Sequence, residues 1–356
     1  WPTHVQSFLR AFNIRVPIVQ APMAGSDSPQ LAVAVSTSGG LGSLAGAMLS
    51  ASDLRSNVTT ILNSTRIVNL NFFCHRIPVE DPLQIQKWRA ALQPFYDELA
   101  CQDSEAALRL PFDESSCKIV EELRPPVVSF HFGLPRQDLF ERVKATGAKI
   151  LCSATTVDEA LFLVKHGGVD AIIAQGYEAG GHRGTFLSHD MALQVGTMSL
   201  VPLIVQTVIR HSRSIPVIAA GGIGDAAGVA AAMRLGASAV QLGTAYLFCP
   251  EANISALYRS ALRQSHDTVV TNVFSGRPAR GIVNHFISKI GPLSPLAPPF
   301  PLASRAVASL RKTSESRGST DFMQMWCGQG AALCREAPAG KLTEDIAVET
   351  LRLLKT

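Results

Sequence analysis

Short apolar runs alternate along the chain with longer segments in which apolar residues recur at helical spacing. The apolar runs cover residues 17–23, 41–46, 67–73, 127–133, 149–154, 171–176, 216–222 and 239–244. Seven of these eight runs precede a segment of helical spacing, such as the one with apolar positions at Val229, Ala232 and Met233. Strands joined through crossover helices pair in parallel. The pattern predicts an α/β fold, a closed (β/α)8 TIM barrel.

An open, doubly wound sheet is the structural alternative to the barrel. It is disfavoured because no Gly-x-Gly-x-x-Gly follows the first apolar run. Two regions interrupt the alternation: residues 81–125 are longer than one helix requires, and residues 251–317 include a proline-rich stretch at 292–301. We therefore expect a barrel over 1–250, an excursion over 251–317 that caps the site, and helices at 321–336 and 341–355, within 318–356, that return to the barrel.

Composition excludes several classes of protein. Hydrophobic residues make up 47% of the chain and charged residues 17%, as in a folded protein with a large core. The net charge is +4 with scattered basic residues, which gives no footprint for nucleic acid. No apolar run reaches the roughly 18 residues of a membrane span. We expect a cytoplasmic protein without nucleic-acid or membrane partners; its start at Trp1 instead of Met leaves open a missing N-terminus.

The cysteines show no spacing typical of a metal site. There are 7 of them, with no Cys-x-x-Cys pair and no Cys/His pattern. We interpret them as reduced thiols, most of them packed in the core, and expect no metal.

Polar residues gather where the predicted strands end, which is where TIM barrels carry their active sites. The ends of the third and sixth strands present Asn71 and Gln175, whose amides suit the edge of a planar heterocycle, and the backbone of Met23 could line its other side. The alternative is that these amides satisfy buried backbone groups. The fourth strand carries His131, which is either a core histidine or a substrate contact.

The ends of the seventh and eighth strands are rich in glycine. Gly221, Gly222 and Gly224 precede a helix, and Gly243 with Thr244 follows the next strand. Free N–H groups at a helix start bind anions such as phosphate. Because no lysine or Walker motif is present, a phosphate here would belong to a bound cofactor. The alternative is that these glycines only form tight turns.

The most informative stretch is residues 174–184, where a buried strand enters a glycine-rich loop that carries His182 and Arg183. Such a loop lets backbone N–H groups approach a ligand closely. We therefore expect His182 to be functional. Glu178, in the same loop, is interpreted as an acceptor for loop N–H groups.

Several motifs, taken together and in order, resemble the nitronate monooxygenase family, formerly called 2-nitropropane dioxygenases. They are Gln20-Ala-Pro-Met, Asn69-x-Asn-Phe-Phe-Cys-His, Ser129-Phe-His-Phe-Gly, Gln175-Gly-x-Glu-Ala-Gly-Gly-His-Arg-Gly, Ala219-Ala-Gly-Gly-Ile, Gln241-x-Gly-Thr, Ser275-Gly-Arg-Pro-Ala-Arg-Gly and Trp326-x-Gly-Gln-Gly-Ala. The resemblance covers nearly the whole chain. It implies an FMN-dependent barrel enzyme that oxidises alkyl nitronates with O₂ to a carbonyl compound and nitrite or nitrate. Propionate-3-nitronate is the implied physiological substrate.

The resemblance also assigns residues to roles. It implies that FMN contacts Met23, Asn71, Gln175, Gly180, Gly222, Gln241, Gly243 and Thr244. His182 takes the place of the family's active-site histidine. It could act as general base toward a neutral nitroalkane, or as a hydrogen-bond donor to the nitro oxygens.

Second-rank candidates for substrate contact are His131, Arg183 and Tyr258. His75 is a further candidate of this rank. Arg277 and Arg280 either close over the site or anchor the excursion through carbonyl groups.

Two other functions remain open at this point. One is an NAD(P)H-dependent flavin reductase of quinones or enoyl thioesters on the same barrel; the other is a non-catalytic flavin-binding carrier or sensor. Chemistry like that of inosine-monophosphate dehydrogenase is disfavoured, because residues 175–197 contain no cysteine nucleophile. The expected partners are a small nitronate or nitroalkane and O₂, and the expected state is a monomer or homodimer.

Overall fold

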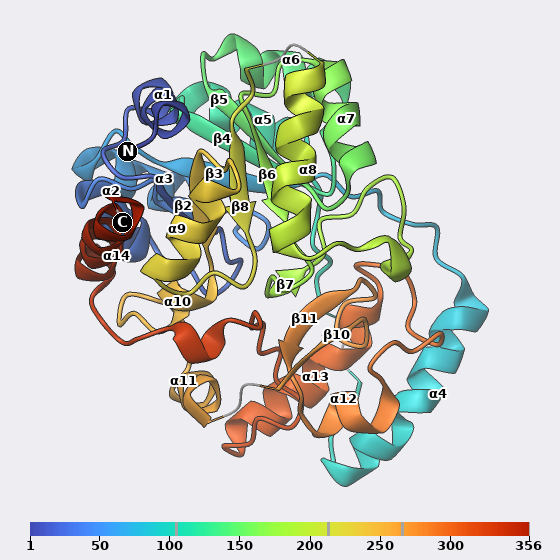
Figure 1. Ribbon diagram of the computed structural model, residues 1–356. Coiled ribbons are helices and arrows are strands. Elements are labelled where there is room, and N and C mark those ends of the chain that lie inside the picture. Colours follow the sequence, from blue (N-terminus) through green and yellow to red (C-terminus); the bar gives the residue numbers. More distant parts are fainter. Residues whose placement is uncertain (104–105, 212–213, 265–266, 356) are drawn as a thin grey trace.

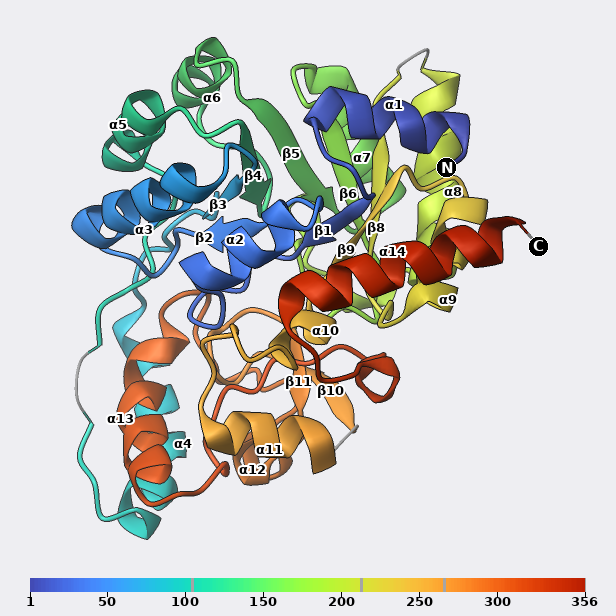
Figure 2. The same cartoon turned by 90° about the vertical axis from the view of Figure 1, so that its left-hand side faces the viewer.

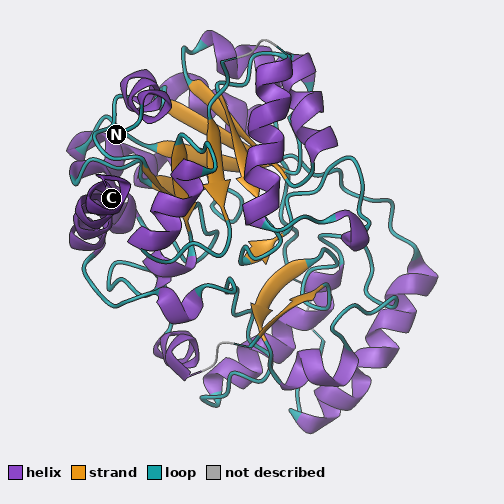
Figure 3. Cartoon of the chain, viewed as in Figure 1, coloured by secondary structure: helices purple, strands orange, loops and turns teal. Residues whose placement is uncertain are grey.

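Eight parallel strands form the centre of the molecule in a computed structural model that describes residues 1–103, 106–211, 214–264 and 267–355. Figures 1 and 3 show these strands enclosed by helices. The strands are β1 (Ile18–Gln20), β2 (Ser43–Ala45), β3 (Asn69–Phe73), β4 (Val127–His131), β5 (Lys149–Ala154), β6 (Ala171–Gln175), β8 (Val217–Ala220) and β9 (Ala239–Leu242). Each falls within one of the predicted runs.

The sheet closes on itself. Its order is β1-β9-β8-β6-β5-β4-β3-β2, and all seven pairings are parallel. A parallel bridge between Val19 and Leu41 joins β1 to the chain just before β2, with Gln20 N donating to Leu41 O at 2.9 Å. The predicted TIM barrel is therefore confirmed.

Helices cover the outside of the barrel and one of its ends. They are α1 (Thr3–Phe12), α2 (Pro29–Thr37), α3 (Ala51–Ser64), α5 (Glu114–Leu123), α6 (Gln137–Ala145), α7 (Val157–His166), α8 (Thr197–Arg210), α9 (Ala226–Arg234), α10 (Thr244–Leu247) and α14 (Ala339–Lys355). Side chains of Ser28, Ser50 and Thr156 cap α2, α3 and α7 by accepting an N–H of the first turn. Phe8 and Phe12 of α1 pack against the strand starts, which closes the end of the barrel away from the strand ends.

A second lobe lies beyond the carboxyl ends of the strands (Figures 1 and 2). It contains α4 (Pro82–Glu98), β7 (Gly181–His182), the 3-10 turn η1 (Met191–Leu193), α11 (Ala256–Gln264), β10 (Thr268–Thr271), β11 (Ala279–Ile282), α12 (His285–Ile290), α13 (Ala303–Ser316) and the 3-10 turn η2 (Ala331–Leu333). β7, β11 and β10 form an antiparallel sheet in which β11 is central. This sheet ties the loop after β6 to the excursion after β9.

The long insertion between β3 and β4 divides between the two parts. α5 packs on the barrel, whereas Trp88 and Phe95 of α4 lie in an apolar cluster with Phe274 and Phe286 of the second lobe. Trp88 also donates its indole N–H to Ala303 O at 3.3 Å. The domain bounds at residues 250 and 317 stay a prediction.

The helix expected at residues 321–336 is wrong. This segment has no α-helix: it consists of turns and irregular backbone, with the short 3-10 turn η2. Trp326 pairs with Gly281 of β11, and two close backbone approaches follow at Gly328 and Gly330, which a helix would not allow. By contrast, the helix expected at 341–355 is confirmed within α14, which packs on α2 and α9.

None of the helices in the described part of the chain is long and apolar enough to cross a membrane. All seven cysteines are free, and Cys117, Cys152, Cys249 and Cys327 are buried. Within the same residues, no cluster of His, Cys, Asp and Glu has the arrangement of a metal site.

Candidate active site

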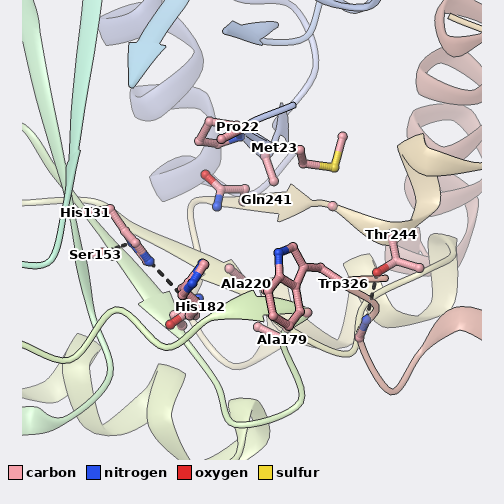
Figure 4. A pocket seen from close by; sticks show the side chains of 18 of the residues that line it. Pro22, Met23, His131, Ser153, Ala179, His182, Ala220, Gln241, Thr244 and Trp326 are labelled. Atoms are coloured by element: carbon pink, nitrogen blue, oxygen red, sulfur yellow. Dashed lines mark hydrogen bonds between the residues drawn. The ribbon is translucent and has the colours of Figure 1, made fainter. Parts of the chain in front are cut away.

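A cavity of about 170 Å³ opens at the carboxyl ends of the barrel strands. It brings together almost all residues that the sequence singled out. Those lining it are Met23, Asn71, His131, Gln175, Gly180, His182, Gly222, Gln241, Gly243, Thr244 and Tyr258. Figure 4 shows His131 and His182 toward one end of the cavity, Thr244 toward the other, and Trp326 between them.

Backbone atoms form the end of the cavity near Thr244. Thr244 Oγ1 accepts a hydrogen bond from Gly328 N at 3.0 Å, which fastens the C-terminal segment to the start of α10. A Cβ at Gly330 would lie 2.5 Å from Gly222 O, and one at Gly180 would lie 2.6 Å from Gly328 N. These glycines therefore serve close backbone packing as well as turns.

The same end can hold an anion. In the described residues, the N–H groups of Gly222 and Gly243 donate to no protein acceptor. A Cβ at Gly243 would meet only Ala21, at 3.5 Å, so the cavity reaches the backbone there. Two free N–H groups beside a threonine hydroxyl suit a phosphate.

The middle of the cavity presents amide edges. Gln241 Oε1 is buried without a partner in the described residues, which is costly unless a ligand donates to it. Asn71 donates its Nδ2 to Ser129 Oγ at 2.9 Å. Met23 is held by its N–H to Asp27 Oδ2 at 2.9 Å. Together, these residues fit a planar heterocyclic group with a phosphate tail.

Gln175 differs from the other amides because protein groups occupy both ends of its side chain. Its Nε2 donates to His182 O at 3.0 Å, and its Oε1 accepts from Gly184 N at 2.7 Å. Gln175 therefore fixes the path of the loop that carries His182. Its predicted contact with a cofactor is compatible with its position in the lining but stays a prediction.

His182 lies on β7, paired with Ala279 of β11, and its ring is surrounded by aromatic residues. The ring centroids of Trp326 and Phe300 lie 5.3 and 5.4 Å from its own. Burial lowers the pKa of His182 well below the usual value, and the positive charges of Arg109 and Arg277 lower it further. The imidazole is therefore neutral at physiological pH.

The proton of Ser275 determines which nitrogen of His182 is basic. His182 Nε2 lies 2.8 Å from Ser275 Oγ, and Ser275 Oγ can also donate to Arg277 O at 3.3 Å. When Ser275 donates to Arg277 O, Nε2–H donates to Ser275 and Nδ1 keeps a free lone pair. When Ser275 donates to Nε2, Nδ1 carries the proton. Nδ1 has no partner among the described residues, and His182 lines the cavity. Nδ1 is therefore available to a ligand, as an acceptor in the first state and as a donor in the second.

His131 has both ring nitrogens engaged. Nε2 lies 3.3 Å from His182 O, and because a carbonyl only accepts, Nε2 carries the proton. Nδ1 then accepts from Ser153 Oγ at 2.7 Å. Burial lowers the pKa of His131 to about 3, so it is neutral. Its Nε2–H binds the backbone carbonyl of His182, and its side chain lines the cavity. Its contact with substrate stays a prediction.

Arg183 is a predicted substrate contact that does not line the cavity. It is fully buried and donates to Gly176 O at 2.7 Å, to Gln175 O at 2.9 Å and to Gln194 Oε1 at 3.0 Å. Its guanidinium therefore holds the loop after β6 and leaves no group for a substrate in this structure.

Arg277 and Arg280 also donate to carbonyl groups of this loop. Arg277 bonds Arg183 O and Thr185 O, and its guanidinium lies 3.8 Å from the centre of the Phe132 ring. Arg280 donates to Tyr177 O at 3.0 Å. Two roles were considered for this pair, closing over the site and anchoring the excursion through carbonyl groups. These hydrogen bonds are of the second kind.

Two further predicted residues have structural partners. Glu178 accepts from Thr197 N at 2.8 Å and from Thr197 Oγ1 at 2.8 Å, so its interpretation as a loop acceptor is confirmed. Tyr258 lines the cavity and donates its hydroxyl to Trp326 O at 2.5 Å. Burial raises the pKa of Tyr258 well above its usual value, so it remains a neutral donor.

The sequence analysis missed several residues of the lining, among them the positively charged Arg109. It comes from the insertion between β3 and β4, far from any strand end, and no motif surrounds it. His75, a second-rank candidate, lies outside the cavity lining and places its Nε2 3.0 Å from Arg109 O. Burial lowers the pKa of His75 to about 4.

Comparison with known proteins shows which family this chain is similar to. The family model described as nitronate monooxygenase matches residues 6–349. A nitronate monooxygenase from Pseudomonas aeruginosa is 41% identical over 97% of this chain and 99% of its own length. Another from Paraburkholderia phytofirmans is 38% identical over 98% of this chain and 95% of its own.

Two solved structures share the fold at appreciable identity. Nitroalkane oxidase from Streptomyces ansochromogenes superposes with a TM-score of 0.87 and 35% identity, covering 96% of this chain and 98% of that one. FabK from Thermotoga maritima superposes with a TM-score of 0.72 and 28% identity, covering 98% and 97%. With the family model matching almost the whole length, and with the cavity built as described, this chain belongs to the nitronate monooxygenase family.

Proposed function

We propose that the protein uses FMN to oxidise alkyl nitronates with O₂, giving a carbonyl compound and nitrite or nitrate. The observation that carries the proposal is the combination, in one cavity, of a buried neutral histidine at one end and free backbone N–H groups at the other. Propionate-3-nitronate is the physiological substrate that we infer. Membership of the family supports oxidation of a nitronate.

The residues divide between cofactor and substrate. Gly222, Gly243 and Thr244 would hold the phosphate of FMN, while Asn71 and Gln241 would bond the edge of its ring; Met23, Gln175 and Gly180 complete that wall. Bound FMN would accept electrons from the nitronate and transfer them to O₂. The unpartnered Gln241 Oε1 supports this assignment, because an N–H of the flavin ring would satisfy it.

His182 has a task that depends on the substrate. A nitronate is already an anion, so it needs no base, and Nδ1–H of His182 can donate to a nitro oxygen. A neutral nitroalkane must first lose its α-proton, which Nδ1 can accept when Nε2–H donates to Ser275. Because the pKa of His182 is lowered, the ring is available in neutral form for either task.

The surroundings of His182 exclude water from the reacting group. Phe73, Phe132 and Phe300 are buried against one another and against the imidazole. A dry environment strengthens the hydrogen bonds and charge interactions made to an anionic substrate.

Nitrite release tests the proposal. Purified protein loaded with FMN should consume O₂ and release nitrite when propionate-3-nitronate or ethylnitronate is added. If a quinone or an enoyl thioester is reduced at the expense of NADH and no nitrite appears, the protein is instead a flavin reductase. Absence of turnover with every substrate would indicate a carrier or sensor.

A further inference from the structure

Arg109 stands between two cavities. It lines the active-site cavity together with His182, and with Phe73 it also lines a second cavity of about 500 Å³. The second cavity lies between the chain around β2, α3 and α5 on one side and α13 on the other. Its walls are largely apolar, with side chains such as Leu49, Leu54 and Val307. A ligand at His182 could therefore extend past Arg109.

The guanidinium of Arg109 has few hydrogen-bond partners among the described residues. Its hydrogen bond within the described residues is to Gln324 Oε1 at 3.4 Å, and no carboxylate in those residues forms an ion pair with it. Arg183 is different, since it makes three shorter bonds, to two carbonyls and an amide. Arg109 is partly buried, and a partly buried cation without a counter-ion is less stable than one that is paired.

The surroundings of Arg109 do not supply the missing negative charge. Burial, together with the positive charge of Arg311, lowers the pKa of Arg109 to about 10, so the group remains charged at neutral pH. His75 and His182 beside it are neutral. Asp113, on the wall of the second cavity, uses its Oδ1 to cap α5 through Ser116 N at 2.8 Å. No carboxylate among the described residues forms an ion pair with Arg109, so its guanidinium is open to an anionic group of a ligand.

We propose that Arg109 and the adjoining second cavity form the subsite for the remote carboxylate of the substrate, and that this subsite also accepts carboxylates on carbon chains longer than that of propionate-3-nitronate. This inference rests on the proposed function. With the nitronate at His182, a carboxylate further along the chain meets the guanidinium fork, which binds carboxylates through two parallel hydrogen bonds. The second cavity leaves space for chains longer than three carbons.

Substrate selectivity of an Arg109 variant tests the proposal. Arg109→Met should lower kcat/KM for propionate-3-nitronate and for the nitronate of 4-nitrobutyrate roughly 10- to 100-fold, because charge-assisted hydrogen bonds are lost. For propylnitronate the change should stay within about threefold, since that substrate has no carboxylate. Arg109→Lys, which retains the charge but not the fork, should lie between. An equal loss on all three nitronates would overturn the subsite and place Arg109 on the nitronate group itself.

Binding of a non-reacting dicarboxylate separates this subsite from the proposed function. Calorimetry on the FMN-loaded protein should detect glutarate, with affinity reduced at least about tenfold in Arg109→Met. Arg335→Met is the matched control, because it removes one positive charge from a surface ion pair with Asp345 and should leave binding unchanged. Glutarate that binds equally to Arg109→Met, or fails to bind the unmodified protein, would contradict the subsite. Arg109-dependent binding without nitronate oxidation would refute the proposed function alone.

Discussion

At the scale of single residues, the proposed reaction depends on one imidazole and on the position of the proton of one serine. The sequence could locate His182, because a histidine in a glycine-rich loop after a buried strand is a recognisable pattern. It could not show that Ser275, the first residue of another motif and 93 residues further along the chain, lies 2.8 Å from Nε2. Tautomer control of this kind depends on contacts between distant segments.

Replacing His182 by asparagine should separate the two tasks of this residue. Asparagine can still donate a hydrogen bond, but it cannot accept a proton. We expect His182→Asn to retain FMN and to lose roughly 100-fold or more in kcat/KM with neutral nitroethane, and far less with ethylnitronate. Oxygen consumption with both substrates provides the measurement. Losses of the same size on both would rule out the general-base role.

His131 should make stability depend on pH. Its pKa is about 3 in the folded protein and near 6.5 when unfolded, so below pH 6.5 the unfolded chain binds a proton that the folded chain does not. Its contribution to stability is complete above pH 6.5 and is lost as pH falls toward 3, by about 1.4 kcal/mol per pH unit.

Denaturant unfolding of His131→Phe and of the unmodified protein at pH 7.0, 6.0 and 5.0 checks this. As the pH is lowered, the free energy of unfolding should fall less steeply in the variant than in the unmodified protein. The difference in slope should approach that of one bound proton, about 1.4 kcal/mol per pH unit. Parallel pH profiles for the two proteins would show that His131 titrates normally in the folded state.

At the scale of elements, the junction between the C-terminal segment and the barrel forms the end of the cavity near Thr244. The motif from Trp326 to Ala331 was visible in the sequence, but helical spacing around it suggested the wrong structure. What overrides local spacing is tertiary contact: Trp326 pairs with β11, and Gly330 lies against Gly222. Sequence patterns do not report such approaches.

A methyl group at Gly330 should disturb this junction. Its Cβ would lie 2.5 Å from Gly222 O, so one of the two backbones must move. We expect Gly330→Ala to lower stability by about 1–3 kcal/mol and to weaken FMN binding. Both are measurable by urea unfolding and by FMN fluorescence on dilution. Ala332→Ser, a small change at an exposed neighbour, serves as the control. If Gly330→Ala behaves like that control, the close approach does not shape the site.

At the scale of the whole molecule, a barrel supplies the frame and a second lobe supplies the enclosure. The eight strands were predictable, because each is a short apolar run followed by a helix or a turn. The packing of α4 against the second lobe was not, since Trp88 and Phe95 find their partners more than 150 residues later in the chain. Arg109 was missed for the same reason: its position depends on how the insertion folds back over the cavity.

The visible spectrum of the purified protein tests the central claim most directly. We expect an oxidised flavin spectrum that loses its absorbance on anaerobic addition of propionate-3-nitronate and regains it when air is admitted, with nitrite in the product. NADH under the same conditions should leave the spectrum unchanged over the same time. A protein without bound flavin, or one bleached by NADH and not by the nitronate, would contradict the account.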